Sequence, residues 1–247
     1  MTRWRSWMCT MTKTTLQQVA NGTPHHQLGG RSNAMALRAA AAYGYFTHEE
    51  DVVHAFRTAM FTHRDPSALD GGEFFARVTW RVVHGGGKVA LRAAIEEVAA
   101  LPSSSPFVKQ KVAQALAKVD EAVDPESALS REEFVDDLAI TSMARLWDVG
   151  KTEPIKVGKA SPTEGTLPGS IYFIVKYADD FAAAATANTM VGGDTASRAV
   201  AIGMVMGAMH GVEGIPQPLR DNLVEFAASD RLLDQLPLLK LSTHAEL

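Results

Sequence analysis

The sequence predicts an all-α fold, organised as a single compact multi-helix bundle. Apolar residues recur at three- and four-residue spacings along most of the chain, and alanine, a strong helix former, is abundant in these segments. Runs of strict apolar–polar alternation, which predict strands, are scarce. The chain has 247 residues, 46% of them hydrophobic and 21% charged, and is therefore long enough to bury a sizeable core.

The expected helices follow from the apolar stripes and from the residues that interrupt them. Thr47 is the expected N-cap of the second helix, with Glu50 as its capping-box partner. Pro66 and Ser67 end that helix, and glycines end the next one after His84. The expected helices cover Ala34–Tyr45, Thr47 to Met60, Ser67 to His84, Val89–Leu101, Phe107–Val123, Arg131–Ala144, Ile171–Thr189, Ala196–His210 and Leu219–Ser229.

Two segments add detail to this helical pattern. The stretch Gly150–Gly169 contains three prolines and four glycines, so we expect a long loop there rather than a helix. Loops of that length in compact domains are often functional. Ala199, Gly203, Gly207 and Gly211 recur every four residues. They predict a ridge almost without side chains, against which another helix packs closely.

Charge and cysteine content exclude several classes of protein. The formal net charge of −4 gives no electrostatic reason to propose a nucleic-acid or anionic-membrane partner. The single cysteine, Cys9, excludes an intrachain disulfide framework and a cysteine-based zinc site. No apolar run reaches the roughly 18 residues of a membrane span, and the N-terminus lacks the apolar core of a signal peptide. We therefore expect a cytoplasmic protein, with its oligomeric state left open.

The stretch VGGDTASRA, Val191 to Ala199, contains the first candidate site residue, Asp194. An aspartate before a helix usually caps it, by accepting hydrogen bonds from backbone N–H groups. The alternative is a helix N-terminus that faces an anionic ligand, or a cation held by Asp194. Both roles stay open at this point, because a carboxylate has two oxygens.

The stretch LGGRSNAMA, Leu28 to Ala36, leads into a helix and forms a glycine-rich loop. Backbone N–H groups at a helix start, together with Arg31 and Ser32, can cradle a phosphate. The alternative is a solvated loop in which Ser32 or Asn33 caps the helix.

Histidines and carboxylates elsewhere have simpler interpretations. His63, in FTHRDP, falls near a helix end, where the helix dipole favours a cation, although a lone histidine is more often structural. His210 is expected to be packed or to cap its helix. The carboxylates in EEFVDD and at Asp179–Asp180 are expected on solvated helix faces, with Glu133 and Asp137 as an i, i+4 pair; the alternative for them is catalysis or metal binding. The mixed charges Lys156, Lys159, Ser161 and Glu164 predict a surface loop, with a lid or binding role as the alternative.

Taken in order, these stretches resemble the ADP-ribosylglycohydrolase family, whose fold is an all-α bundle around a binuclear magnesium site. GRSNAMALRAA resembles the family's loop that contacts ADP-ribose. FTHRDP, followed by the glycines of ALDGGEFFA, resembles its Thr-His segment, whose histidine lies beside the ligand. TLPGSIYF and VGGDTASRAVAIGMVMGAMHG resemble its C-terminal core. The resemblance covers about Gly29 to Gly214.

The resemblance implies a function, a cofactor and site residues. It implies Mg²⁺ as the cofactor, and ADP-ribose or an ADP-ribosylated substrate as the partner. It divides the chain into a partial or divergent N-terminal segment, residues 1–28, and a helical domain, residues 29–247. The implied metal ligands are Asp194 and Ser197, and the implied ligand-binding residues are Gly30, Arg31, Ser32, Asn33 and His63.

The sequence departs from the family pattern at its metal cluster. The family reads Asp-x-Asp-Ser/Thr where this chain has Asp194-Thr195-Ala196-Ser197, and no Thr/Ser-Asp-Asp set precedes Gly29. Two magnesium ions need more oxygen ligands than Asp194 and Ser197 supply. Two hypotheses follow. The first is a hydrolase of the glycosidic bond that links ADP-ribose to an acceptor; the second is a non-catalytic helical protein that binds ADP-ribose or a related nucleotide, or is structural in the manner of the family-related lens crystallins.

Overall fold

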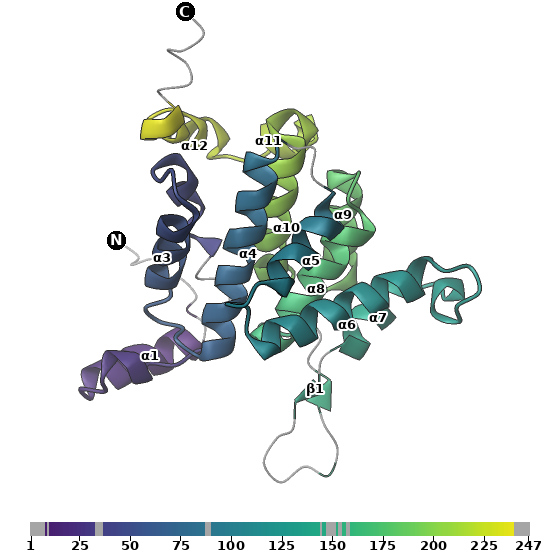
Figure 1. Cartoon of the computed structure of the whole chain (residues 1–247), viewed down its shortest axis with the longest axis horizontal. Coiled ribbons are helices and arrows are strands. Elements are labelled where there is room, and N and C mark those ends of the chain that lie inside the picture. Colours follow the sequence, from purple (N-terminus) through teal and green to yellow (C-terminus); the bar gives the residue numbers. More distant parts are fainter. Residues whose placement is uncertain are drawn as a thin grey trace, which may run out of the picture.

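The chain folds into a helical bundle, which confirms the all-α prediction (Figure 1). Strands in the described part of the chain are limited to the antiparallel pair β1 (Arg145–Leu146) and β2 (Ile155–Lys156). No helix in that part is long and apolar enough to cross a membrane. The computed structural model describes residue 8, residues 10–32, 37–86, 90–143 and 145–146, residue 152, and residues 155–156 and 159–239.

The helices follow one another with short connections. The first half contains α1 (Thr10–Ala20), the 3₁₀ turns η1 (His25–Gln27) and η2 (Ala40–Gly44), α3 (Glu49–Ala59), α4 (Pro66–His84), α5 (Leu91–Ala100) and α6 (Pro106–Val123). The second half contains η3 (Leu129–Arg131), α7 (Val135–Met143), α8 (Thr163–Lys176), α9 (Phe181–Val191), α10 (Thr195–His210), η4 (Val212–Gly214), α11 (Gln217–Asp221) and α12 (Phe226–Leu233).

Three helices form the centre of the bundle. Helices α4, α8 and α10 contact one another, and α6 packs along α8 (Figure 1). Every residue of α8 from Gly165 to Ile174 is buried, so this helix is enclosed on all sides. Phe75 and Val78 of α4 and Val205 of α10 are fully buried against it in the same apolar core. The first turns of α8 and α10 are therefore held by a rigid interior.

Helix α8 begins inside the stretch that was expected to be a loop, so that prediction is wrong for Thr163 to Gly169. Pro168 has no N–H to donate to the carbonyl of Glu164, which normally disfavours a helix interior. Here the burial of the segment outweighs that loss. The expected helix Ile171–Thr189 is also two helices, because Asp180 caps α9 and accepts a hydrogen bond from the backbone of Ala183 at 2.8 Å.

Other helix boundaries are confirmed or corrected by their caps. Helix α4 ends at His84 before Gly85, as expected. The N-cap position of α3 is His48 rather than Thr47, and its side chain makes no capping hydrogen bond. The expected helix Leu219–Ser229 is divided into α11 and α12. The expected first helix contains the 3₁₀ turn η2, and its residues 34–36 lie outside the described residues, as do Cys9 and Gly87.

The glycine ridge on α10 does not have the tight packing that its spacing predicts. A methyl group added to Gly203 or Gly207 would have no atom of the described chain within 4 Å. The close approach occurs instead at Gly169 of α8, where such a methyl group would lie 3.1 Å from Cδ of Arg198. The close contact between the two helices therefore needs a small residue at Gly169 of α8, because the long side chain of Arg198 from α10 packs against it.

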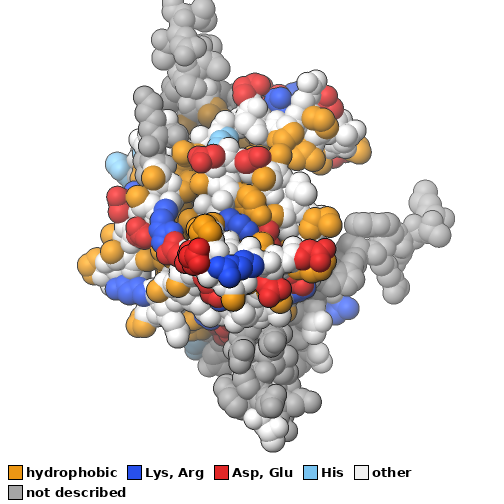
Figure 2. Space-filling model, turned by 90° about the vertical axis from the view of Figure 1, so that its right-hand side faces the viewer, with side chains coloured by type: hydrophobic (Ala, Val, Ile, Leu, Met, Phe, Trp, Pro, Cys, Tyr) orange, Lys and Arg blue, Asp and Glu red, His pale blue; other side chains and the backbone are white. Residues whose placement is uncertain are grey.

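Charged groups are mixed on the surface. On the face shown in Figure 2, acidic and basic side chains lie next to one another, with hydrophobic atoms between them. Among the described residues, ion pairs such as Arg92 with Asp120, at 2.7 Å, account for part of this mixture. This pattern agrees with the small net charge of the chain.

Candidate functional site

The described part of the glycine-rich loop lies against the Thr-His segment. A methyl group on Gly30 would lie 2.6 Å from Cδ2 of the His63 ring, so only glycine allows this approach. The backbone N–H of Asp65 donates to the carbonyl of Gly30 at 3.3 Å. The structure therefore brings together two of the segments that the sequence singled out. Asn33, predicted on the same loop, lies outside the described residues.

His63 is buried beneath this loop, with 2% of its surface exposed. Its Nδ1 atom lies 2.8 Å from Oγ1 of Thr62, whose carbonyl accepts a hydrogen bond from Thr15 of α1. Burial, and secondarily the positive charge of Arg38, lowers the pKa of His63. The helix end favours a protonated, positively charged His63, but burial disfavours that form. The neutral imidazole is therefore the stable form at neutral pH.

Arg31 connects the glycine-rich loop to the first turn of α8. Its carbonyl accepts two hydrogen bonds from Thr163, one from the backbone N–H at 2.7 Å and one from the hydroxyl. Its guanidinium lies 3.6 Å from Oε1 of Glu164. Thr163 is fully buried, and only 16% of the Glu164 side chain is exposed. Interpreting this region as a surface loop was therefore wrong for these two residues.

The same connecting segment, Lys159–Glu164, also contacts the glycine turn at Gly192–Asp194. The backbone N–H of Asp194 donates to the carbonyl of Lys159 at 2.7 Å. Gly193 has φ +72°, and a methyl group there would overlap with the Lys159 carbonyl, so the turn requires glycine twice over. Lys159 Nζ forms an ion pair with Asp137 of α7. The carboxylate at Asp137 therefore has a cation beside it.

Asp194 caps α10, as the simpler of the two interpretations expects. Its Oδ1 accepts the backbone N–H of Ser197 at 3.1 Å, and its Oδ2 accepts the hydroxyl of Ser197 at 2.8 Å. Both predicted metal ligands thus bond to each other. Ala196, between them in sequence, is exposed on the first turn of the helix.

A buried arginine behind this turn, Arg198, has a role that the sequence pattern does not predict. Arg198 is fully buried, and its Nε donates to Oδ1 of Asn188 at 2.7 Å, while Nη2 donates to the carbonyl of Gly192 at 2.6 Å. Asn188 in turn donates to the carbonyl of Thr195 at 3.0 Å. Burial lowers the pKa of Arg198, and Asp194 partly offsets that effect. An arginine among the small apolar residues of this helix was the available sequence signal.

The predicted segments therefore meet through three sets of contacts, Gly30 with His63, Arg31 with Thr163, and Lys159 with Asp194. A family model for ADP-ribosylglycohydrolase matches residues 1–245. The chain belongs to the ADP-ribosylglycohydrolase family. No curated protein matches it. The match confirms the resemblance that the motifs predicted; the division of the chain at residue 28 stays a prediction.

A binuclear magnesium site of the ADP-ribosylglycohydrolase type does not fit the described residues. They contain no group of three or more His, Cys, Asp or Glu side chains arranged to hold a metal ion. Each carboxylate oxygen of Asp194 accepts one hydrogen bond from Ser197. Asp136 is engaged too, since Tyr172 and Tyr177 donate to its carboxylate at 2.7 Å each. Mg²⁺, with Asp194 and Ser197 as its ligands, stays a prediction.

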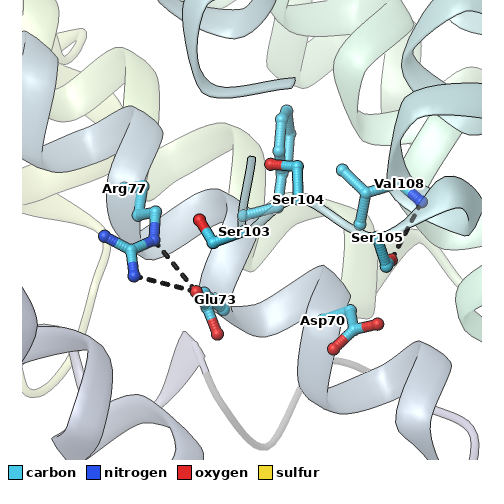
Figure 3. Close-up of a pocket in the computed structure, with 8 residues that line it drawn as sticks. Asp70, Glu73, Arg77, Ser103, Ser104, Ser105 and Val108 are labelled. Atoms are coloured by element: carbon cyan, nitrogen blue, oxygen red, sulfur yellow. Dashed lines mark hydrogen bonds and ion pairs between the residues drawn. The ribbon is translucent and has the colours of Figure 1, made fainter. Parts of the chain in front are cut away.

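Remaining candidates have structural roles in the described chain. The Nε2 atom of His210 lies 2.7 Å from the carbonyl oxygen of Ala178, as expected for a packed histidine. A separate shallow hollow lies between α4 and the start of α6, where the Arg77 guanidinium points at Glu73 (Figure 3). Its lining includes no residue predicted for the ligand or the metal; it consists of Asp70, Glu73, Phe74, Arg77, Ser103, Ser104, Ser105 and Val108.

Proposed function

We propose that this member of the family binds the ADP-ribose part of a nucleotide or of an ADP-ribosylated substrate, without metal-dependent hydrolysis. One observation carries the proposal. The glycine-rich loop, His63 and the glycine turn at Gly192–Asp194 are joined by direct contacts through Lys159–Glu164. These are the segments through which the family resemblance implies ligand contact.

Arg31 is the group best suited to bind the diphosphate. Its side chain is 48% exposed, and its only ion pair among the described residues, with Glu164, is long at 3.6 Å. A guanidinium binds phosphate oxygens through two parallel hydrogen bonds, which is stronger than such a loose pair. The backbone N–H of Arg31 donates to Sδ of Met11. Because sulfur is a weak acceptor, a phosphate oxygen can replace it.

Hydrolysis receives less support from the same geometry. Activation of water by magnesium requires a set of oxygen ligands that fixes the ion. The side chain of Ala196 carries no oxygen, and both carboxylate oxygens of Asp194 already accept hydrogen bonds. Binding of ADP-ribose needs neither feature.

Calorimetry with ADP-ribose tests the binding. We expect binding heat for the wild type, about a tenfold weaker affinity for Arg31→Ala from the loss of a charge-assisted contact, and no change for Arg131→Ala. Arg131 is an exposed arginine that pairs with Glu126 at the far end of α6. Absence of heat with the wild type would leave only a structural role.

A release assay separates binding from hydrolysis. ADP-ribosylated protein is incubated with the chain and magnesium, and in parallel with a chelator. We expect no metal-dependent release of ADP-ribose. Release that needs magnesium and is lost in Asp194→Ala would establish the hydrolase hypothesis instead, with Asp194 and Ser197 as metal ligands.

A further inference from the structure

We propose that Thr163, the first residue of α8, is a positioning residue for Arg31 in the described part of the glycine-rich loop, Leu28 to Ser32. The inference rests on the proposed function and deepens it, because it names the group that holds the loop in its binding shape. The sequence predicts a loop around Thr163 by its length and composition, but it assigns no role to Thr163 itself.

Thr163 fixes the direction of one carbonyl in the loop. The first backbone N–H groups of a helix have no partner within the helix. At Thr163 this donor and the side-chain hydroxyl both bond to the carbonyl of Arg31. Because a peptide unit is planar, the direction of the Arg31 carbonyl also fixes the N–H of Ser32. The backbone donor that follows Arg31 is thus oriented by a side chain 132 residues away.

Glu164 complements this contact on the side chain of the same loop residue. Its Oε1 lies 3.6 Å from the Arg31 guanidinium, while its Oε2 is buried and has no hydrogen-bond partner among the residues that the structure describes. The position at the start of a helix favours the negative charge of Glu164. The first turn of α8 therefore fixes the backbone of Arg31 and places a carboxylate near its side chain.

Thr163 can act in this way because the structure on both sides of it is fixed. The residues that follow, from Gly165 onward, are enclosed in the core. Before it, Lys159 is held through its carbonyl by Asp194 and through its ammonium group by Asp137. Thr163 itself has no exposed surface, so it cannot contact a ligand directly. Its effect on binding must pass through Arg31.

The test compares Thr163→Val with Thr163→Ser. Valine has nearly the shape of threonine but lacks the hydroxyl, whereas serine retains it. Hydrogen exchange of the ligand-free protein and calorimetry with ADP-ribose are measured for both variants. Thr58→Val, at an exposed position of α3, is the control.

We expect Thr163→Val to raise exchange at the backbone amides of Arg31 and Ser32 and to weaken ADP-ribose binding about five- to tenfold, the effect of one hydrogen bond. Thr163→Ser restores both, and Thr58→Val changes neither. Unchanged exchange in Thr163→Val overturns the proposal, whatever the affinity. Faster exchange with unchanged affinity shows that the hydroxyl holds the loop without serving binding, and rejects it as well. If the wild type binds no ADP-ribose while exchange still responds, the proposed function fails, and only the contact between Thr163 and the loop stands.

Discussion

Two basic side chains, His63 and Arg198, are buried, and they differ in their charge state and in their hydrogen-bond partners. His63 lies beneath Gly30 with one hydroxyl partner, and burial lowers its pKa. Arg198 stays an arginine cation, and its partners among the described residues are the side-chain amide of Asn188 in α9 and backbone carbonyl groups. One of its nitrogens, Nη1, has no hydrogen-bond partner in that part of the chain. A buried cation without a paired carboxylate is costly, so the turn at Gly192 is stabilised at the expense of global stability.

The buried state of His63 predicts a pH dependence of stability. Since its pKa is lower in the folded than in the unfolded protein, the folded state binds the proton less well. The stabilisation is complete above the unfolded pKa, near 6.5, and is lost as the pH falls below it. Urea unfolding at a series of pH values should show this loss, and His63→Gln should flatten it. An equal slope in wild type and variant would contradict the prediction.

Asp194 can be tested as a cap independently of any metal. Asparagine caps helices about as well as aspartate, whereas alanine does not. We expect Asp194→Asn to leave the free energy of unfolding nearly unchanged and Asp194→Ala to lower it by about 1 kcal/mol. Chemical denaturation measures both. Ser197→Ala is the matched control, because it removes the hydroxyl contact and keeps the backbone N–H that Asp194 accepts. Equal losses in both Asp194 variants would show that the charge, rather than the cap, is the important property.

At the scale of elements, the contact between α3 and α4 centres on Arg77. Its guanidinium lies 3.1 Å or less from Glu49, Glu50 and Glu73, and only 9% of the side chain is exposed. These contacts raise the pKa of Arg77, the hydrogen bond to Glu50 contributing most. Glu50, expected to complete a capping box, thus serves to join two helices.

Removal of Arg77 should lower the free energy of unfolding more than removal of an exposed arginine does. Arg77→Leu removes the guanidinium that joins Glu49 and Glu73, although Glu49 keeps Arg81 and Glu73 keeps Arg57 as a partner, each at 2.7 Å. We expect a loss of about 2 kcal/mol in unfolding free energy, the scale of hydrogen bonds to charged groups. Arg92→Leu breaks an exposed pair with Asp120 and should cost less than about 1 kcal/mol. Denaturant titration of both variants checks the difference. Similar losses would mean that burial adds nothing to the Arg77 network.

The elements that the sequence predicted well are those with a one-sided apolar stripe. Helices α4, α5 and α6 follow their stripes closely. Helix α8 could not be predicted in this way, because it is buried on all sides and contains Pro168. Its start depends on tertiary packing, which overrides local propensity. Asp180 was a readable N-cap signal that was interpreted instead as part of a carboxylate pair.

The candidate site was predicted in its parts but not in its connections. Gly30, His63 and Asp194 each stand in a recognisable stretch, and the structure joins them. Thr163 and Arg198 carry no local signature, because their roles depend on partners far away in the sequence or on burial. The side-chain hydrogen bonds of Asp194 were foreseeable from its position, while its contact with Lys159 was not.

For the molecule as a whole, the family match favours a metal-dependent hydrolase, whereas the side chains of the described residues do not favour a metal site. The match over residues 1–245 shows membership of the ADP-ribosylglycohydrolase family, for which the sequence resemblance implies magnesium, yet the described residues contain no group of side chains arranged to hold a metal ion. In the described bundle, α8 and α10 pack against each other and against α4 at the centre.

Magnesium should therefore not stabilise the protein. A ligand that binds only the folded state raises the unfolding temperature with its concentration. We expect the thermal midpoint to be the same in millimolar magnesium and in chelator, measured by calorimetry at equal ionic strength. Calcium serves as the control for non-specific charge effects. A magnesium-specific rise that disappears in Asp194→Ala would contradict this prediction and restore the metal site.

The exposed methyl group of Ala196 shows that a larger side chain can be accommodated at this position. Solvent borders this position on the first turn of α10, so a longer side chain there displaces no neighbour. Acidic residues are favoured near helix N-termini, which makes Ala196→Asp compatible with the fold. An aspartate at this position, where the family pattern has one, would therefore need no repacking around it. A single substitution supplies the carboxylate, because the helical turn that would present it is already formed.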